Sequence, residues 1–158
     1  MAALGVALDD PEPRVRAEVV QALGRIRDTA AVEPLVAALA DSEPHIRREA
    51  AEALGKLRDV GAVDGLVAAL TDSDPSVARH AAEALGQIRD AAAVEGLVAA
   101  LGHQDSHVVE ASAEALGRIR SEEAVDGLTA ALRNAEGVAV QQIIQALGRA
   151  GVTEEATP

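Results

Sequence analysis

Leucine recurs along this chain at a fixed interval of 31 residues. Aligning residues 29–59 with residues 60–90 gives 19 identities in 31 positions, and no insertion is needed anywhere. A sustained period of this length is typical of repeat architectures, in which each unit covers the apolar face of its neighbour. Three leucine columns carry the period: Leu4, Leu35, Leu66, Leu97 and Leu128; Leu8, Leu39, Leu70, Leu101 and Leu132; Leu23, Leu54, Leu85, Leu116 and Leu147.

The period divides the chain into five units that form one domain. The expected boundaries are about 1–27, 28–58, 59–89, 90–120 and 121–150, and residues 151–158 are expected to be a C-terminal tail. The chain starts in the register of a first helix but lacks its N-cap, and Leu4, Val6 and Leu8 have little polar cover. Terminal repeats of solenoids normally carry a polar outer face. We therefore expect either a longer parent array or self-association through the uncapped N-terminal helix.

Each unit contains two helical patterns. In the second unit, apolar residues at helical spacing predict a first helix over about 30–40, preceded by Asp28 as its N-cap. A short turn at 41–44 ends it. Pro44 then suits the first position of a second helix that runs to about Leu57. The units in sequence therefore predict an all-α fold.

Gly55 lies inside the predicted second helix, where glycine costs about 1 kcal/mol relative to alanine. Because Leu57 continues the apolar face, the helix is expected to pass through Gly55. One interpretation is a row of small residues, with Ala51 four positions earlier, that lets neighbouring second helices approach closely. The alternative is a left-handed cap at the end of the helix. Close packing is favoured.

The segment AVEPLVAALADSEPHIRREAAEALGKLRD resembles the HEAT-like repeat of the phycobilin-lyase type. The resemblance covers about residues 1–150 and implies a right-handed α-α superhelix, a HEAT-like solenoid whose second helices line a concave face. The family pattern has Val-Arg early in the second helix. Arg16 and Arg47 keep this arginine, whereas Ala78, Val109 and Val140 replace it.

Composition narrows the possible functions. The chain of 158 residues is 49% hydrophobic, has no aromatic residue and no cysteine, and carries a formal net charge of −12. Thiolate metal sites and disulfides are excluded. Nucleic acids are disfavoured partners, because they need basic patches and stacking platforms. The lack of cysteine fits a cytoplasmic location. No apolar run approaches a membrane-spanning length, so we expect no membrane partner.

The solvent-facing columns of the second helices differ between units while the core columns stay constant. Such variation on a fixed scaffold is what a surface shaped for one partner would show, although unconstrained surface positions also drift. Ion pairs at i,i+4 spacing on these helices are equally ordinary surface features. The candidate partner-binding residues are His45, Arg48, Glu49, Glu52, Arg79, His80, Glu83, His107, Glu110, Glu114 and Gln141.

Catalytic, cofactor and metal sites have little support in the sequence. HEAT-like relatives include deoxyhypusine hydroxylase, whose di-iron site uses His-Glu pairs on successive second helices, and no corresponding pair here is His-Glu. His103, His107 and Glu110 have ligand-like spacing, but His103 falls in a turn column that holds Asp10, Asp41 and Asp72 elsewhere. Serine nucleophiles with a base and phosphate-binding glycine loops are also lacking. We expect no catalytic residue, cofactor or metal.

Two functional hypotheses follow. The first is a non-catalytic interaction scaffold that binds a protein or peptide on the concave face. The alternative is a bilin lyase subunit or a bilin-handling protein, as the resemblance permits. The lack of aromatic residues to stack on a tetrapyrrole favours the scaffold.

Overall fold

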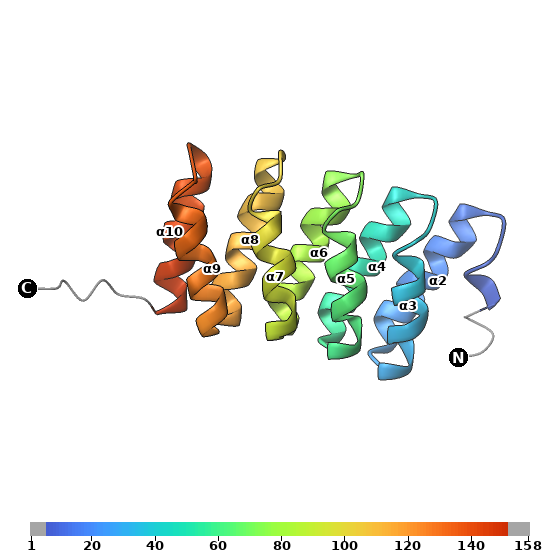
Figure 1. The fold of residues 1–158 in the computed structure, drawn as a ribbon. Helices are drawn as coiled ribbons and strands as arrows, with labels where there is room; N and C mark the ends of the chain where they lie inside the picture. The colour runs from blue at the N-terminus through green and yellow to red at the C-terminus, as the bar shows by residue number, and fades with distance from the viewer. Residues whose placement is uncertain (1–5, 152–158) are drawn as a thin grey trace, which may run out of the picture.

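A computed structural model of the chain describes residues 6–151 and shows helices stacked in two layers (Figure 1). First helices, each preceded by a 3₁₀ turn in the central repeats, alternate with second helices. The elements are α2 (Pro13–Ile26), η1 (Thr29–Ala31), α3 (Val32–Ala38), α4 (Pro44–Leu57), η2 (Val60–Ala62), α5 (Val63–Ala69), α6 (Pro75–Ile88), η3 (Ala91–Ala93), α7 (Val94–Ala100), α8 (Ser106–Ile119), α9 (Glu122–Leu132) and α10 (Val138–Ala150). The arrangement confirms the predicted all-α superhelix. None of these helices is long and apolar enough to cross a membrane.

The predicted cap of the first helix in the second repeat is present, but that helix is shorter than predicted. The Asp28 carboxylate accepts a hydrogen bond from the backbone N–H of Ala30 at 2.9 Å, and the Asp28 carbonyl oxygen accepts one from the N–H of Ala31 at 2.9 Å, which closes a 3₁₀ turn before α3 begins. The α-helix therefore covers Val32–Ala38 instead of 30–40. In the last repeat Ser121 bonds the N–H of Ala124, three positions on, and α9 starts at once and is longer.

The second helices begin and end as the sequence predicts. Proline stands at the start of α2, α4 and α6, where its missing N–H has no intrahelical acceptor to lose. Helix α4 passes through Gly55 and ends at Leu57. The left-handed residue that follows is Arg58, with φ 55°, so the cap interpretation of Gly55 is wrong. Arginine occupies this conformation after α2, α6 and α8 as well.

The glycine of each second helix lies against an alanine of the next. A Cβ atom built on Gly55 would stand 2.9 Å from Cα of Ala84, closer than real Cβ atoms come, and 3.0 Å from its Cβ. This confirms the close-packing prediction. Successive first helices instead touch through a longer side chain, since Gly65 faces Val36. The second helices thus form the tighter, inner row of the stack, and we call their solvent-facing side the concave face.

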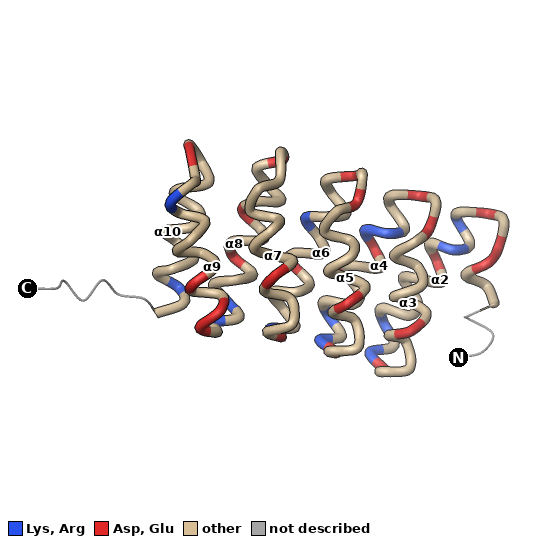
Figure 2. The backbone as a smooth tube through the Cα atoms, in the orientation of Figure 1, with Lys and Arg blue, Asp and Glu red and all other residues tan. Residues whose placement is uncertain are grey.

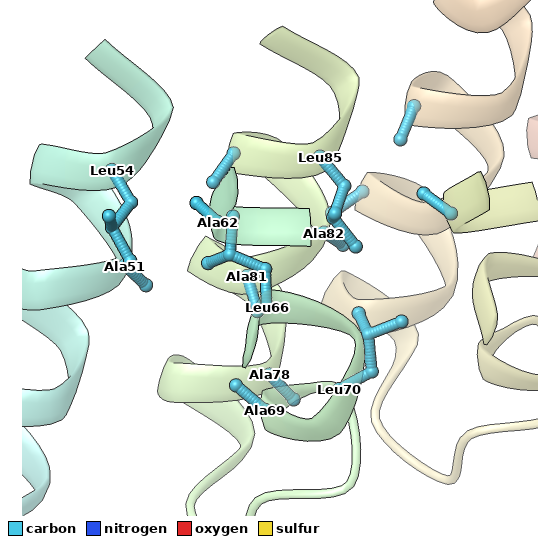
Figure 3. Packing of buried hydrophobic residues seen from close by; sticks show 14 of the residues in the cluster. Ala51, Leu54, Ala62, Leu66, Ala69, Leu70, Ala78, Ala81, Ala82 and Leu85 are labelled. Carbon is cyan, nitrogen blue, oxygen red and sulfur yellow. The ribbon is translucent and has the colours of Figure 1, made fainter. Parts of the chain in front are cut away.

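The core runs continuously between the layers and is built from small aliphatic residues (Figure 3). Leu54, Leu66 and Leu85 are fully buried, with alanines such as Ala51 and Ala81 filling the spaces between them. None of these buried side chains is larger than leucine or isoleucine, so the two layers of helices pack close together. Extensive burial of this kind is the main source of stability in a repeat array.

Candidate functional site: the concave face

Two pockets on the concave face have the same construction. The first holds about 280 Å³ between α2 and α4, and the second about 210 Å³ between α6 and α8. Each of the seven residues that line the second pocket lies two repeats after a residue that lines the first. The lining residues are Val20, Gln21, Gly24, Arg25, Glu49, Glu52, Ala53 and Lys56 in the first pocket, and Glu83, Gly86, Gln87, Ala111, Glu114, Ala115 and Arg118 in the second.

The pocket floors are made by the glycine–alanine contacts. Gly24 meets Ala53 in the first pocket, and Gly86 meets Ala115 in the second. Because neither residue has a long side chain, the helix surfaces leave a hollow above the contact. Between the two pockets the side-chain oxygen of Gln87 reaches to within 3.0 Å of the Cβ position on Gly55. The small-residue row therefore both tightens the fold and hollows its inner surface.

Carboxylates and cations alternate on the pocket walls. Lys56 donates to Glu52 at 2.7 Å, and this bond holds the pKa of Glu52 below its ordinary value. Arg118 donates to Glu114 at 2.8 Å, and Arg149 of the next helix approaches the same carboxylate at 3.6 Å. These side chains are between one third and just over one half exposed, so the pairs contribute little to stability.

The remaining candidate residues lie along the same helices in solvent-facing or half-buried positions. His80 is half-buried and donates from Nδ1 to the carbonyl oxygen of Ser76 at 2.7 Å. Arg79 pairs with Glu83 at 3.2 Å. The structure places the others as follows: His45, His107, Glu110 and Gln141 are exposed, and Arg48 and Glu49 are half-buried, with Glu49 3.3 Å from the Gln21 side-chain amide.

His103 lies in a turn, before α8 begins, as the repeat alignment predicts. Its Nδ1 accepts a hydrogen bond from the N–H of Asp105 at 2.9 Å. Asp41 and Asp72 accept the equivalent bonds from Glu43 and Asp74. His103 thus substitutes for a turn aspartate. Within residues 6–151 no three histidine or acidic side chains converge as metal ligands would.

Sequence reasoning missed a pair of inter-repeat clamps outside the concave face. Arg47 donates two bonds to Asp72, from Nε and Nη2, each at 2.7 Å, and a third to the carbonyl oxygen of Asp41 at 2.8 Å. Arg16 binds Asp41 in the same way, at 2.7 and 2.9 Å. These arginine and aspartate side chains are 8–12% exposed. Each bidentate pair therefore ties one repeat to the next.

The clamps shift the acidity of their carboxyl groups. Hydrogen bonds from Arg16 hold the pKa of Asp41 below its ordinary value. Burial raises the pKa of Asp72, but bonds from Arg47 and from the N–H of Asp74 outweigh it, so the net shift is again downward. Both aspartates therefore stabilise the fold in their ionised form.

The later repeats lack both the arginine and the aspartate of the clamp. Ala78 replaces the arginine of α6, and His103 replaces the aspartate that it would bind. Val109 and Asn134 make the same joint replacement one repeat later. This coupled loss is the signal that could have revealed the pair. A largely apolar pocket of about 480 Å³ lies near the first unclamped junction, lined by Val67, Leu70, Thr71, Gly96, Ala99, Ala100, Gly102 and His103.

Comparison with known proteins agrees with this arrangement of stacked helix pairs. A family model described as HEAT repeats matches residues 1–74 and 63–148. The chain belongs to the HEAT repeat family. The predicted resemblance to the phycobilin-lyase type of repeat is also confirmed by a solved structure, described next. No curated protein sequence matches this HEAT repeat chain.

Three solved structures illustrate the similarity. The complex of CpcE and CpcF of phycocyanin lyase from Nostoc sp. PCC7120 contains a chain that is 28% identical with TM-score 0.75, over 93% of this HEAT repeat chain and 63% of that chain. An engineered protein is 28% identical with TM-score 0.70, over 94% and 78%. A computationally designed armadillo repeat protein for modular peptide recognition is 22% identical with TM-score 0.64, over 93% and 80%, which shows the fold alone. This HEAT repeat chain thus spans less than two thirds of the lyase chain.

Proposed function

We propose that the concave face binds an extended segment of a protein partner, with no catalytic step. The observation that carries this proposal is the pair of equivalent pockets two repeats apart. A recurring pocket suits a ligand that is itself periodic, as an extended peptide is. Neighbouring packed helices lie about 8–10 Å apart, so the two pockets are separated by roughly 16–20 Å.

The spacing defines the register of the bound segment. An extended chain advances about 3.3 Å per residue, so about six residues span the two pockets. Side chains of an extended strand alternate between faces, so residues i and i+6 point the same way and enter successive pockets. The Gly24–Ala53 and Gly86–Ala115 floors suit an aliphatic stem.

The carboxylates of the walls can receive a basic side chain at each of these positions, in exchange for the exposed ion pairs that Glu52 and Glu114 make with Lys56 and Arg118. Each pocket carries two carboxylates, Glu49 with Glu52 and Glu83 with Glu114. The ammonium group of a lysine whose stem lies on the floor can reach them. The net charge of −12 also steers basic segments toward the protein. The partner-binding residues proposed from the sequence include all four of these carboxylates.

A labelled peptide with lysines at i and i+6 in a Gly/Ser background tests the proposal by fluorescence anisotropy. We expect saturable binding that weakens by about tenfold or more in the variant Glu52→Gln with Glu114→Gln, the size expected when two charge-assisted bonds of about 1 kcal/mol or more are lost. The matched control is Glu33→Gln with Glu95→Gln, the same charge change on exposed positions of the first helices. Equal weakening by both variants, or no binding to the wild type, would overturn the proposal.

A second candidate, handling of a bilin, is favoured by the similarity to a chain of the phycocyanin lyase complex. The two concave pockets, of about 280 and 210 Å³, are smaller than the range of about 300–1,000 Å³ usual for small-molecule sites. The apolar pocket of about 480 Å³ falls within that range but has no Phe, Tyr or Trp side chain to stack on a tetrapyrrole, so we place this candidate second. Titrating phycocyanobilin with the protein and recording the visible spectrum distinguishes the two. A shifted, saturating absorbance supports bilin handling, and an unchanged spectrum leaves the peptide-binding scaffold.

A further inference from the structure

The two ends of the stack carry opposite halves of the contact that joins its repeats. Inside the stack the glycine of each second helix faces the alanine of the next: Gly24 with Ala53, Gly55 with Ala84, Gly86 with Ala115 and Gly117 with Ala146. At α10 the corresponding Gly148 has no described atom within 4 Å of its Cβ position. At α2 the corresponding alanine is Ala22, which is only half-buried. One end thus presents the glycine half, and the other presents the alanine half.

Ile144 makes the exposed face of α10 apolar. The equivalent residues of the preceding repeats, Val20, Ala51, Ala82 and Ala113, are 0–1% exposed, whereas Ile144 is 54% exposed. A second helix of a following repeat covers this position inside the stack. Val20 is β-branched and is fully buried in the junction between α2 and α4, so a β-branched side chain fits such a junction. Ile144 therefore suits the same kind of cover.

The two ends of the stack also carry the polar residues that form a hydrogen bond at the edge of an internal junction. Inside the stack the amide of Gln21 donates to the Glu49 carboxylate at 3.3 Å across the α2–α4 junction. The repeat places Gln145 where Gln21 lies and Glu18 where Glu49 lies. Gln145 and Glu18 are both exposed. Stacking α10 on a second α2 would recreate this hydrogen bond.

We propose that two copies of this chain associate head to tail, with the α10 face formed by Ile144, Leu147 and Gly148 packed on the α2 face formed by Glu18, Ala22 and Arg25 of a second copy. The occupant is a second copy because α2 carries the alanine that fills this place in every internal contact. Pairing two α10 faces would oppose glycine to glycine and leave no alanine to fill the contact. A head-to-tail contact does not close on itself, so further copies can add.

Light scattering coupled to size-exclusion chromatography tests the association over a wide range of loading concentrations. The wild-type apparent mass should rise with concentration to at least about twice the monomer value. Ile144→Glu should remain monomeric. Val138→Glu is the matched control, since Val138 is 62% exposed on the same helix but lies in the solvent-facing concave column. This control should associate like the wild type, and circular dichroism should show equal helix content in all three proteins.

Mixing two blocked variants tests the polarity of the contact. Ile144→Glu blocks the α10 face and Ala22→Glu blocks the α2 face, so each alone should be monomeric. Their mixture keeps one intact face of each kind and should form a dimer that grows no further. A wild type that stays monomeric throughout, equal loss in Ile144→Glu and Val138→Glu, or a mixture that remains monomeric would each overturn the proposal.

Discussion

The N-terminal and C-terminal halves of this HEAT repeat stack use the same helix pairs but fasten them differently. The α2–α4 and α4–α6 junctions add a bidentate arginine–aspartate clamp to their apolar contact. The α6–α8 and α8–α10 junctions have alanine or valine in place of the arginine, and histidine or asparagine in place of the aspartate. The glycine–alanine contact is common to all four. The comparison indicates that the architecture requires the glycine–alanine contact, whereas the arginine–aspartate clamp is an addition at two of the junctions.

Removing one partner of a clamp should have the largest effect. In Arg47→Ala the Asp72 carboxylate, in a side chain only 10% exposed, loses the guanidinium that neutralises it. We expect a loss of about 3 kcal/mol in the free energy of unfolding, because an uncompensated buried charge is costly. Urea unfolding followed by circular dichroism at 222 nm measures the loss.

The double variant Arg47→Ala with Asp72→His is the control for this prediction. It converts the clamped junction into a copy of the Ala78 and His103 arrangement. The histidine can accept the N–H of Asp74 as His103 accepts the N–H of Asp105. We expect it to lose only about 1 kcal/mol, since replacing both partners leaves no charge unpaired. A double variant as unstable as the single one would refute the clamp.

Adding one carbon to the shared contact should have the next largest effect. Gly55→Ala places a Cβ 2.9 Å from Cα of Ala84, so the helices must move apart. We expect a net loss of about 2 kcal/mol, since overpacking outweighs the gain in helix propensity. Gly148→Ala is the matched change at a position that is open within one chain, and at concentrations where the protein is monomeric it should gain about 0.5–1 kcal/mol instead. Thermal unfolding of both variants checks the opposite signs.

The smallest effect is expected at the left-handed residues that both halves share. Arg58 has φ 55°, a conformation that costs an L-residue about 1 kcal/mol or more and costs glycine little. Arg58→Gly should therefore stabilise the fold by about 0.5–1 kcal/mol. The same substitution at Arg120, with φ 57°, should have the same effect. Different signs at the two sites, measured by thermal unfolding, would contradict a purely local origin.

The sequence was a good guide to features that depend on local spacing. The period, the leucine columns, Pro44 at the start of α4 and the close approach at Gly55 were all predicted from neighbours along one helix or from the repeat itself. The first helix of the second repeat was predicted over about 30–40, which is longer than the observed α3. The aspartate before it accepts bonds from the next two available N–H groups, on its carboxylate and on its carbonyl oxygen, and so begins a 3₁₀ turn that helical periodicity does not distinguish from the helix.

The clamps escaped prediction because their partners are 25 positions apart and belong to different repeats. Arg47 was noticed only as a match to a family pattern, and Asp72 only as a turn residue. Comparing the two columns shows that they change together at Ala78 with His103, which a reading of single columns overlooks. The concave pockets were not predicted either, because their floors are made of glycines and alanines, whose side chains carry no functional group.

Hydrogen exchange measured helix by helix at two pH values tests the difference between the halves most directly. The lowered pKa values of Asp41 and Asp72 mean that their stabilisation is complete above the ordinary aspartate pKa and is lost as pH falls through the folded values. From about pH 6 to about pH 3, we predict that amides of α4 lose more protection than amides of α8, after correction for intrinsic exchange rates. Equal losses in the two helices, or a larger loss in α8, would contradict a stack whose N-terminal junctions are held by ionised clamps.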